Sequence, residues 1–412
     1  MKLIVTCVLG KMHVDFYKRM EKAFRKEGYQ FLFLASNYST YHYAIQQKCN
    51  VKLLRRKHIS VERECYQGLD DRLLNSMDVK IGLFNLKSAV DYYKSIYELL
   101  ESINQKHKIS LALAFQNART EEMALHDFAA NHSIDKLFFE YSNMPGKLFC
   151  DREGSNKKSE LYLSHNRVLD QFDCPSDEEY NEWKKGYLKI KFKQVSVPQA
   201  QMTWHRTPME EIKDVLSSLF ITHVPFANKN TLSVIKTRLN RKFNRNALIP
   251  YFADFDAEKN KKQYIFFPLQ VSADTQIIIN SDIGLIEALQ KAVDIARKAN
   301  MKLVIKPHPA ESNKVAQGKI LDIARKNHCV ICNNNTFDLI QHAYKVITIN
   351  STVGLESMIL GTPVEVLADA FYKNFSYEQL KKYLLRYLVN IELFSNNEIK
   401  DIQWLLDRAK IS

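Results

Sequence analysis

The sequence predicts an α/β protein with two Rossmann-like domains, and two observations support this prediction. The chain has 412 residues, which is enough for two hydrophobic cores of roughly 150–200 residues each. Short apolar runs also alternate with helical stretches in two separate regions, which is the pattern of parallel sheets covered by helices. The expected division is an N-terminal domain at 1–175, a basic and partly helical insertion at 176–258, a C-terminal domain at 259–376 and C-terminal helices at 377–412.

The N-terminal region shows this alternation clearly. Compact apolar runs are typical of buried strands, whereas apolar residues spaced three or four apart indicate helices. The expected elements are a strand from Leu3 to Val8, a helix from Phe16 to Lys26, a strand from Tyr29 to Leu34, a strand from Leu111 to Phe115, a helix from Thr120 to Asn131 and a strand from Lys136 to Glu140. Such a series fits one doubly wound parallel sheet.

The C-terminal region repeats the pattern. Its expected elements are a strand from Tyr264 to Pro268, a helix from Ser281 to Asn300, a strand from Lys302 to Ile305, a helix from Asn313 to Asn327, a strand from Cys329 to Cys332, a helix from Thr336 to Tyr344 and a strand from Val346 to Ile349. A helical stretch with one apolar face is expected from Tyr377 to Lys410.

The composition is that of a folded protein, with 46% hydrophobic and 25% charged residues. No apolar run reaches the roughly 18–20 residues that a membrane-spanning helix needs. The apolar N-terminus gives way to charge at Lys11 with no small-residue cleavage site, so a first strand is expected rather than a signal peptide. We therefore expect a cytoplasmic protein.

The seven cysteines are an odd number without the spacing of a disulfide framework, which indicates a reducing compartment. Cys329 and Cys332 have the spacing of a redox or zinc motif, but no second pair completes a metal site. The two apolar residues between them favour a buried strand. No metal site is expected.

The formal charge of +13 favours anionic partners. No zinc-finger spacing, arginine-rich tail or aromatic RNA-recognition signature accompanies it, so nucleic acid is not an expected partner. From Thr231 to Arg245, apolar residues follow one helical face and basic residues lie mostly elsewhere. Such a helix either lies on an anionic membrane surface or packs on a domain.

A strand that runs into Asn350-Ser351-Thr352-Val353-Gly354-Leu355-Glu356 carries the strongest local signal. Hydroxyl and backbone N–H groups at the positive end of a helix form a ready phosphate site. Asn350, Ser351 and Thr352 are also helix-capping residues, and capping alone would explain two of the three. Glu356, about one turn into the helix, could accept a hydrogen bond from a ribose hydroxyl.

Two more polar segments follow expected strands. Lys306-Pro307-His308-Pro309 holds a histidine between prolines that fix the backbone, although a histidine at a strand end is often structural. After the strand ending at Pro268 comes a loop with Gln270, Ser272, Asp274 and Thr275, which could equally be an ordinary connection. The carboxyl ends of parallel strands are the edge where open α/β sheets bind ligands.

Glu140 ends an apolar strand of the N-terminal domain. A carboxylate at that edge suits a general base or a nucleophile, while the alternative is a surface residue without a catalytic role. Asp151-Arg152-Glu153-Gly154-Ser155-Asn156 follows in the sequence.

Taken together, these residues resemble the capsule polysaccharide biosynthesis family, which contains the bacterial β-Kdo transferases (Kdo is 3-deoxy-D-manno-oct-2-ulosonic acid). The resemblance rests on the segments Pro268-Leu269-Gln270-Val271 with Asp274, Lys306-Pro307-His308-Pro309 with Glu311, Asn350 to Glu356 with Gly361, Pro363 and Val364, and more weakly on Phe139-Glu140 and Asp151 to Asn156.

This resemblance implies a GT-B-like fold with the active site in a cleft between the two domains. It implies retaining transfer of a Kdo-type ulosonic acid from a CMP-activated donor, without a metal or other cofactor, to a capsule or lipid-linked glycan. The N-terminal domain would bind the acceptor and the C-terminal domain the nucleotide sugar, with an anionic inner membrane face as a further partner. Alternatives are a donor such as CMP-sialic acid, CDP-glycerol or a UDP-sugar, or a non-catalytic glycan- or lipid-binding protein.

The resemblance also assigns roles to residues. Glu140 and Asp274 would be the catalytic carboxylates, His308 would contact CMP, Ser351 and Thr352 its phosphate, and Glu356 the ribose. Gln270, Lys306, Asn350 and Gly354 complete the expected nucleotide-binding set. One departure from the family pattern is Tyr141-Ser142, because relatives usually place Asp or Asn and then Gly after the strand-end Glu. If that position carried the chemistry, Asp274 or Asp151 would have to replace it.

Overall fold

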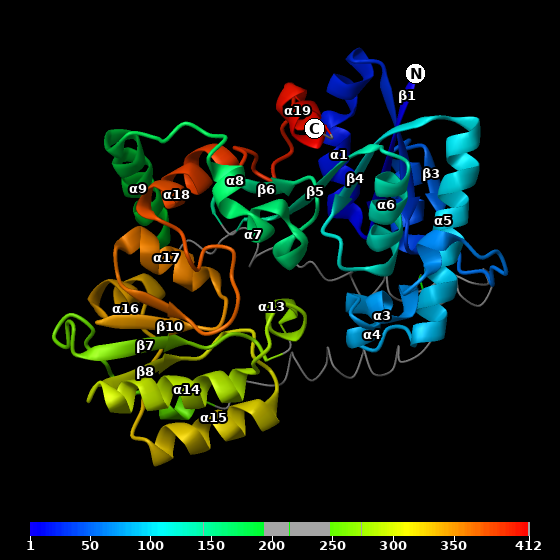
Figure 1. The fold of residues 1–412 in the computed structure, drawn as a ribbon. Helices are drawn as coiled ribbons and strands as arrows, with labels where there is room; N and C mark the ends of the chain where they lie inside the picture. Colours follow the sequence, from blue (N-terminus) through cyan, green and yellow to red (C-terminus); the bar gives the residue numbers. More distant parts are fainter. Residues whose placement is uncertain (143, 193–213, 215–247, 273, 411–412) are drawn as a thin grey trace. The chain divides into compact units, whose positions relative to one another are not determined.

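The computed structural model describes residues 1–142, 144–192, 214, 248–272 and 274–410, which form two compact units (Figure 1). The first unit contains residues 1–165 and 388–410, and the second contains 166–192 and 248–387. The helix expected from Thr231 to Arg245 lies outside the described residues, as does most of the basic insertion.

The first unit is built on a six-stranded sheet in the order β3-β2-β1-β4-β5-β6. Its strands are β1 (Lys2–Val8), β2 (Tyr29–Ala35), β3 (Val51–Leu53), β4 (Ile109–Phe115), β5 (Asp135–Tyr141) and β6 (Leu148–Asp151). All pairings are parallel except that of β6 with β5. The four strands expected from the sequence are all present.

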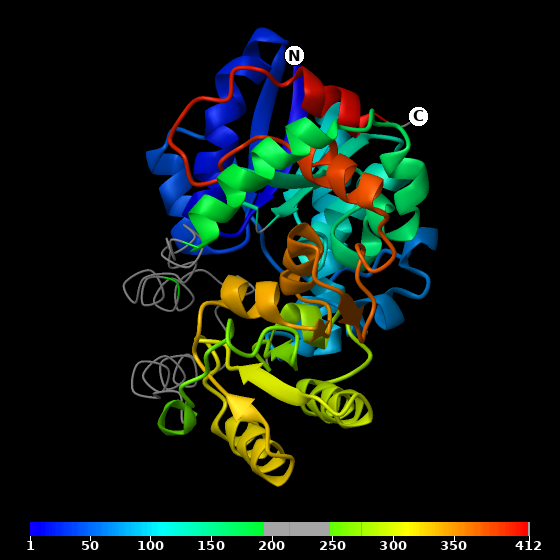
Figure 2. The same cartoon turned by 90° about the vertical axis from the view of Figure 1, so that its left-hand side faces the viewer.

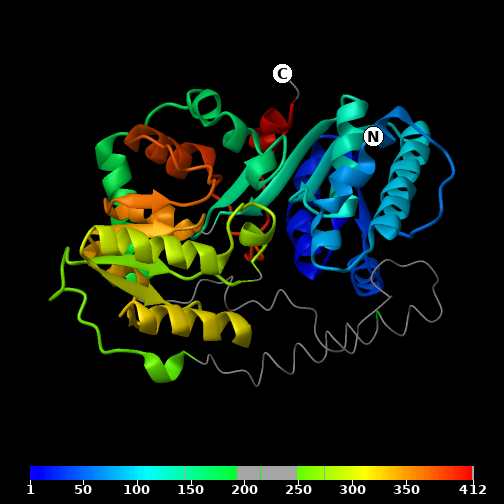
Figure 3. The ribbon, with the colours of Figure 1, turned by 60° about the horizontal axis from the view of Figure 1, so that its bottom comes forward.

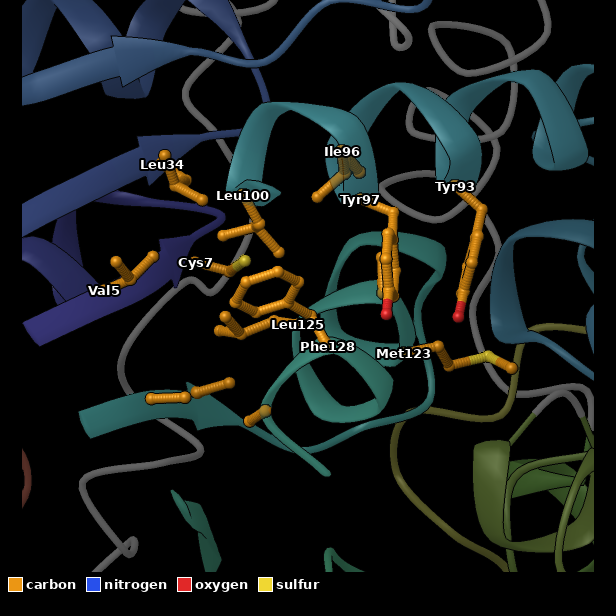
Figure 4. Close-up of a cluster of buried hydrophobic side chains, with 14 of the residues drawn as sticks. Val5, Cys7, Leu34, Tyr93, Ile96, Tyr97, Leu100, Met123, Leu125 and Phe128 are labelled. Atoms are coloured by element: carbon orange, nitrogen blue, oxygen red, sulfur yellow. The ribbon is translucent and has the colours of Figure 1, made fainter. Parts of the chain in front are cut away.

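Helices cover both faces of this sheet (Figures 1 and 3). The helices α5 (Leu86–Lys106), α6 (Thr120–Asn131) and α3 (Leu69–Leu74) pack on one face, and α1 (Lys11–Lys26), α2 (Tyr38–Gln46) and α19 (Gln403–Ala409) pack on the other. Figure 4 shows the first face, where Tyr97 and Leu100 of α5 and Phe128 of α6 meet Val5 and Cys7 of β1. Shorter elements are α4 (Met77–Lys80), α7 (Glu160–Leu163), η1 (Glu64–Tyr66) and η2 (Asn156–Lys158).

The second unit holds a five-stranded, all-parallel sheet in the order β11-β10-β7-β8-β9. The strands are β7 (Tyr264–Pro268), β8 (Lys302–Lys306), β9 (Val330–Ile331), β10 (Lys345–Thr348) and β11 (Val364–Val366). β9 confirms the strand expected between Cys329 and Cys332, and both cysteines are free thiols.

The helices of the second unit also form two layers (Figures 1 and 2). α14 (Leu285–Lys298) and α15 (Lys314–Lys326) cover one face, and α16 (Thr336–His342) and α17 (Thr352–Leu360) cover the other. Short elements are α8 (His165–Leu169, starting at the boundary), η4 (Ile249–Tyr251) and α13 (Thr275–Ile278). The α/β fold class with two Rossmann-like domains is therefore confirmed, and the GT-B-like arrangement of the two domains around a cleft stays a prediction.

The described start of the basic, partly helical insertion is a helix. α9 (Asp177–Phe192) is a regular helix of 16 residues and belongs to the second unit. Two ion pairs join it to the segment after β11, one from Lys381 to Asp177 at 3.0 Å and one from Arg386 to Glu179 at 2.6 Å. Its buried face carries only Tyr180 and Tyr187, so the hydrophobic pattern is weak.

The helices expected from Tyr377 to Lys410 are present only at the two ends of that stretch. α18 (Tyr377–Lys382) and the π-helical turn η5 (Tyr383–Tyr387) end in the second unit, and the chain is then non-helical until α19 in the first. Val389 instead pairs with Leu148 of β6. The Arg19 side chain also binds the backbone carbonyls of residues 392, 393 and 397, which a helix would use internally.

Within the described part of the chain, none of the helices is both long enough and apolar enough to cross a lipid bilayer.

We expect α19 to contribute to the stability of the first unit because Leu405 is fully buried in its core. Leu405→Ala should lower the free energy of unfolding by about 2–5 kcal/mol, since it leaves a cavity. Thermal unfolding followed by circular dichroism measures the change. Leu163→Ala is a matched control, because this leucine is 67% exposed and its loss should cost less than about 0.5 kcal/mol. Equal unfolding temperatures for both variants would contradict the role of α19.

Candidate functional site

The carboxyl edge of the second sheet gathers the predicted nucleotide-binding segments. β7 lies between β8 and β10, and the strand order reverses between β7 and β10. Such a reversal is the usual ligand-binding point of an open parallel sheet. The segments 269–276, 306–311 and 349–356 leave these three adjacent strands at the same edge.

Gln270 and Asn350 bind each other across this point. The Gln270 amide donates to Asn350 Oδ1 at 3.1 Å, and Asn350 N–H donates to Gln270 Oε1 at 3.4 Å. The Asn350 amide also donates to the carbonyls of Gln276, at 2.9 Å, and Asn280. Both side chains are buried, so they hold the loop after β7 against the start of α17. Direct contact of either one with a nucleotide stays a prediction.

Ser351 caps α17, as the capping interpretation expects. Its hydroxyl accepts a hydrogen bond from Val353 N–H at 3.2 Å, and its carbonyl accepts one from the Tyr372 hydroxyl. Thr352 is the first residue of the helix. The first-turn N–H groups give this helix end a positive partial charge, which favours a phosphate. The binding of a phosphate by Ser351 and Thr352 stays a prediction.

Gly354 has a packing role. A Cβ atom at this position would lie 2.5 Å from the hydroxyl oxygen of Tyr372, so the Tyr372 ring lies directly against the backbone of α17. Tyr372 is 1% exposed. The glycine is therefore what allows this tyrosine to bind the carbonyl of Ser351.

Glu356 faces α9. Its Oε1 accepts hydrogen bonds from Lys191 Nζ at 3.0 Å and from the Tyr187 hydroxyl at 3.3 Å. The Lys191 ammonium also lies over the rings of Tyr187 and Phe337, 5.5 Å from each centroid. Glu356 thus anchors α9 to α17, and its contact with a ribose stays a prediction.

Lys306 and His308 differ in their surroundings. The Lys306 ammonium donates to the Asn334 carbonyl at 2.6 Å and to the Thr336 hydroxyl at 2.9 Å, which ties the end of β8 to the start of α16. The solvent-accessible His308 accepts a hydrogen bond from Ala310 N–H at Nδ1, so in its neutral form Nε2 carries the proton. Partial desolvation lowers the pKa of His308, and the carboxylates of Asp274 and Glu311 oppose this shift.

Asp274 caps the one-turn helix α13. Its Oδ1 accepts a hydrogen bond from Gln276 N–H at 2.9 Å, and its carbonyl accepts from residues 277 and 278. Within the described ranges, its Oδ2 has no hydrogen-bond partner. Its carboxylate favours the charged form of His308 electrostatically. That these two residues share one ligand site stays a prediction.

Glu140 occupies the end of β5 in the first unit. Its Oε1 accepts hydrogen bonds from the side-chain amides of Asn156 at 3.0 Å and Gln116 at 3.2 Å. Burial nevertheless raises the pKa of Glu140 to about 7, because these neutral donors do not replace full hydration. Gln116 and Asn156 both have left-handed backbones, with φ of 64° and 52°. Non-glycine residues in this region are strained and concentrate at functional sites.

Asp151 has a structural role instead. Its Oδ1 accepts hydrogen bonds from the N–H groups of Glu153, Gly154 and Glu160, and its Oδ2 accepts one from Leu161. These four bonds shape the loop that presents Asn156 to Glu140. Asp151 is 3% exposed, so its carboxylate is a poor substitute for a catalytic group.

The unusual pair Tyr141-Ser142 is accommodated by local contacts. The Tyr141 hydroxyl donates to Met12 Sδ at 3.2 Å, and the Ser142 hydroxyl lies 2.7 Å from the Lys147 carbonyl. Ser142 thereby links the residues at the two ends of the connection between β5 and β6.

Sequence reasoning gave no role to three residues that organise these sites. Glu311 was visible only as part of the motif after Lys306, Gln116 carries no local signal for a left-handed backbone, and Lys191 lies in a helix whose packing partner the sequence does not indicate. Among the residues that the structure describes, no group of three or more His, Cys, Asp or Glu side chains could hold a metal ion.

The chain is similar in sequence to one protein family and to several known proteins. The family model "Capsule polysaccharide biosynthesis protein" matches residues 110–376. Protein FixF of Sinorhizobium fredii (strain NBRC 101917 / NGR234) is 33% identical over 117 residues, 26% of this chain and only 27% of FixF. Capsule polysaccharide modification protein LipB of Neisseria meningitidis serogroup B (strain ATCC BAA-335 / MC58) is 22% identical over 300 residues, 68% of this chain and 69% of LipB. The structure of Thermosulfurimonas dismutans KpsC, a beta Kdo 2,7 transferase, is 16% identical, with 99% of this chain and 98% of that chain covered at a TM-score of 0.42.

We expect Gly354→Ala to destabilise the second unit by about 1–3 kcal/mol, because the added methyl group overlaps the Tyr372 ring. Gly318→Ala in α15 is the matched control, since a Cβ there meets no atom within 4 Å. That control should gain about 0.5–1 kcal/mol from helix propensity. Urea unfolding of both variants provides the measurement, and a stabilised Gly354→Ala would contradict the packing role.

Proposed function

The chain belongs to the capsule polysaccharide biosynthesis protein family, and from this premise we propose that it is a glycosyltransferase. Its donor is a CMP-activated ulosonic acid of the Kdo type, and its acceptor is a capsule or lipid-linked glycan. The transfer retains the configuration of the anomeric carbon. The observation that supports this chemistry most directly is the Glu140 carboxyl, which is held by two amides with a pKa of about 7.

In the first step, the Asp274 carboxylate attacks the anomeric carbon of the donor. The bond from that carbon to the phosphate oxygen breaks, and CMP leaves with the electron pair. The sugar is then an ester of Asp274, as expected for retaining transfer through two displacements. An Oδ2 without a partner in the described part of the chain and a backbone fixed by α13 suit this role.

In the second step, an acceptor hydroxyl attacks the anomeric carbon and releases Asp274. Glu140 takes the proton of that hydroxyl. A general base works best when its pKa lies near the working pH, which is the case for a carboxyl with a pKa of about 7. The amides of Gln116 and Asn156 keep the carboxylate in one orientation.

The departing CMP phosphate requires positive charge, which the protein supplies without a metal in this proposal. The start of α17 contributes the partial charge of its first-turn N–H groups. His308 contributes an Nε2–H donor, because its Nδ1 is already bonded to Ala310 N–H. Lys306 does not contact the phosphate in this proposal, and its ammonium group fixes the start of α16.

Glu140→Gln and Asp274→Asn should each lower kcat at least about tenfold, a barrier increase of ~1.4 kcal/mol, while CMP binding changes little. With Glu140 as a base, the rate should fall as pH drops below about 7, because protonation removes the acceptor of the proton. Steady-state kinetics from pH 5 to 9 test both expectations.

Glu153→Gln is the matched control for this experiment, since Glu153 pairs with Lys136 and its pKa is lowered to about 2. It should retain activity within about twofold. A rate that falls above pH 7 would make Glu140 an acid instead. Full activity in both carboxylate variants would show that neither residue is catalytic.

The donor assignment is tested with a panel of CMP-Kdo, CMP-sialic acid, CDP-glycerol and UDP-sugars. Among these donors, we expect turnover only of CMP-Kdo. Turnover should be faster with anionic phospholipid vesicles, because the net charge of +13 favours a lipid-linked acceptor at the inner face of the cytoplasmic membrane. Release of nucleotide measured by chromatography is the readout. Turnover of another donor would replace CMP-Kdo, and binding without turnover of any donor would indicate a non-catalytic relative.

A further inference from the structure

One buried carboxylate connects the loops that carry Asp274 and His308. Glu311 Oε2 accepts a hydrogen bond from Ser272 N–H at 2.6 Å, and its Oε1 accepts one from Asn313 N–H at 2.7 Å. Ser272 belongs to the loop after β7, and Asn313 belongs to the loop after β8. Glu311 is 6% exposed, so water screens these charged hydrogen bonds weakly.

The backbone of Glu311 is fixed as firmly as its side chain. Its N–H donates to the His308 carbonyl at 3.1 Å, and its own carbonyl accepts from the amide of Gln317 at 2.9 Å. Gln317 is 1% exposed and lies in α15. The carboxylate therefore connects the loop after β7 to a rigid helix through a short turn.

This connection sets the relative position of two groups that must meet one donor. Asp274 lies two residues beyond Ser272, and His308 lies three residues before Glu311. A shift of either loop by about 1 Å would move one group away from a ligand that the other still contacts, which typically slows catalysis strongly.

Glu311 also acts on His308 through its charge. Among the residues that the structure describes, Asp274 and Glu311 favour the charged form of this imidazole, and Lys306 opposes it. Replacing Glu311 by a neutral residue should therefore lower the pKa of His308 further.

We propose that Glu311 is a positioning residue for the nucleoside monophosphate part of the donor, acting on Asp274 and His308 through the Ser272 and Asn313 N–H groups. This inference rests on the proposed function, because it assumes that both groups face one CMP-sugar. Glu311 itself does not touch the reacting atoms.

The experiment compares wild type, Glu311→Gln, Glu311→Asp and Val315→Ala in the full chain. Val315→Ala is the matched control, because this valine lies in the first turn of α15 but is 69% exposed, so its loss should leave the hydrogen bonds of Glu311 to Ser272 and Asn313 in place. We expect Glu311→Gln to weaken CMP binding by calorimetry about tenfold or more and to lower kcat/KM further, with Val315→Ala within about threefold of wild type.

The histidine Cε1–Hε1 NMR signals separate positioning from a general loss of structure. The His308 signal, identified with His308→Gln, should titrate at lower pH in Glu311→Gln. Glu311→Asp keeps the charge with a shorter reach, so it should weaken CMP binding while leaving that titration near its wild-type position. If Glu311→Gln does not fold, Glu311→Asp still carries the test.

The outcomes distinguish this inference from the proposed function. Wild type that binds no CMP would overturn the proposed function itself. Wild type that binds CMP while Glu311→Gln and Glu311→Asp bind equally well would overturn the positioning role alone. An equal loss in Val315→Ala would show that any change at the start of α15 has the same effect, which also overturns it.

Discussion

Hydrogen bonds between loops that follow adjacent parallel strands are the constraint on which the candidate site of the second unit depends. Parallel strands bring polar loops to one edge, but nothing in the sheet itself fixes those loops relative to one another. Gln270 and Asn350 join the loops after β7 and β10, and Glu311 joins those after β7 and β8. The loop after β7 is thus held on both sides before any ligand binds. Binding therefore costs less conformational entropy.

The carboxylates of the protein show how hydrogen bonding separates structural from chemical roles. Asp151 accepts four backbone N–H bonds, which engage both of its carboxylate oxygens in shaping a loop. Glu140 is also removed from water, and the effect of burial outweighs the hydrogen bonds that its carboxylate accepts, so its pKa rises. Two acidic residues from neighbouring strands, β5 and β6, therefore have different roles.

The sequence was sufficient for most of the strands and for the edge where the candidate site lies, since both follow from short apolar runs and from the residues that end them. The short strands β3, β6 and β11 were not predicted. It was not sufficient where partners distant in sequence decide the structure. Arg19 and Leu148 hold the segment around residues 389–397 in a non-helical form, although its local pattern suggests a helix. Glu356 looked like a ribose ligand, and its pairing with Lys191 of α9 depends on tertiary packing that no local pattern shows. Gly354 was predicted as a nucleotide-binding residue, and the Tyr372 ring that packs against it lies in a later loop that no local pattern indicates.

The return of residues 388–410 to the first unit has a consequence for the synthesis of the protein. The strand β6 obtains its partner Val389, and the core around Phe16 obtains Leu405, only after the second unit has been translated. During synthesis, the first unit therefore emerges from the ribosome before α19 is available to cover its apolar face. This face stays uncovered for the time needed to add more than two hundred residues. Co-translational folding of this chain is thus not strictly sequential. Its first domain is completed last, and its vulnerability to aggregation and proteolysis is greatest while the polypeptide is still attached to the ribosome.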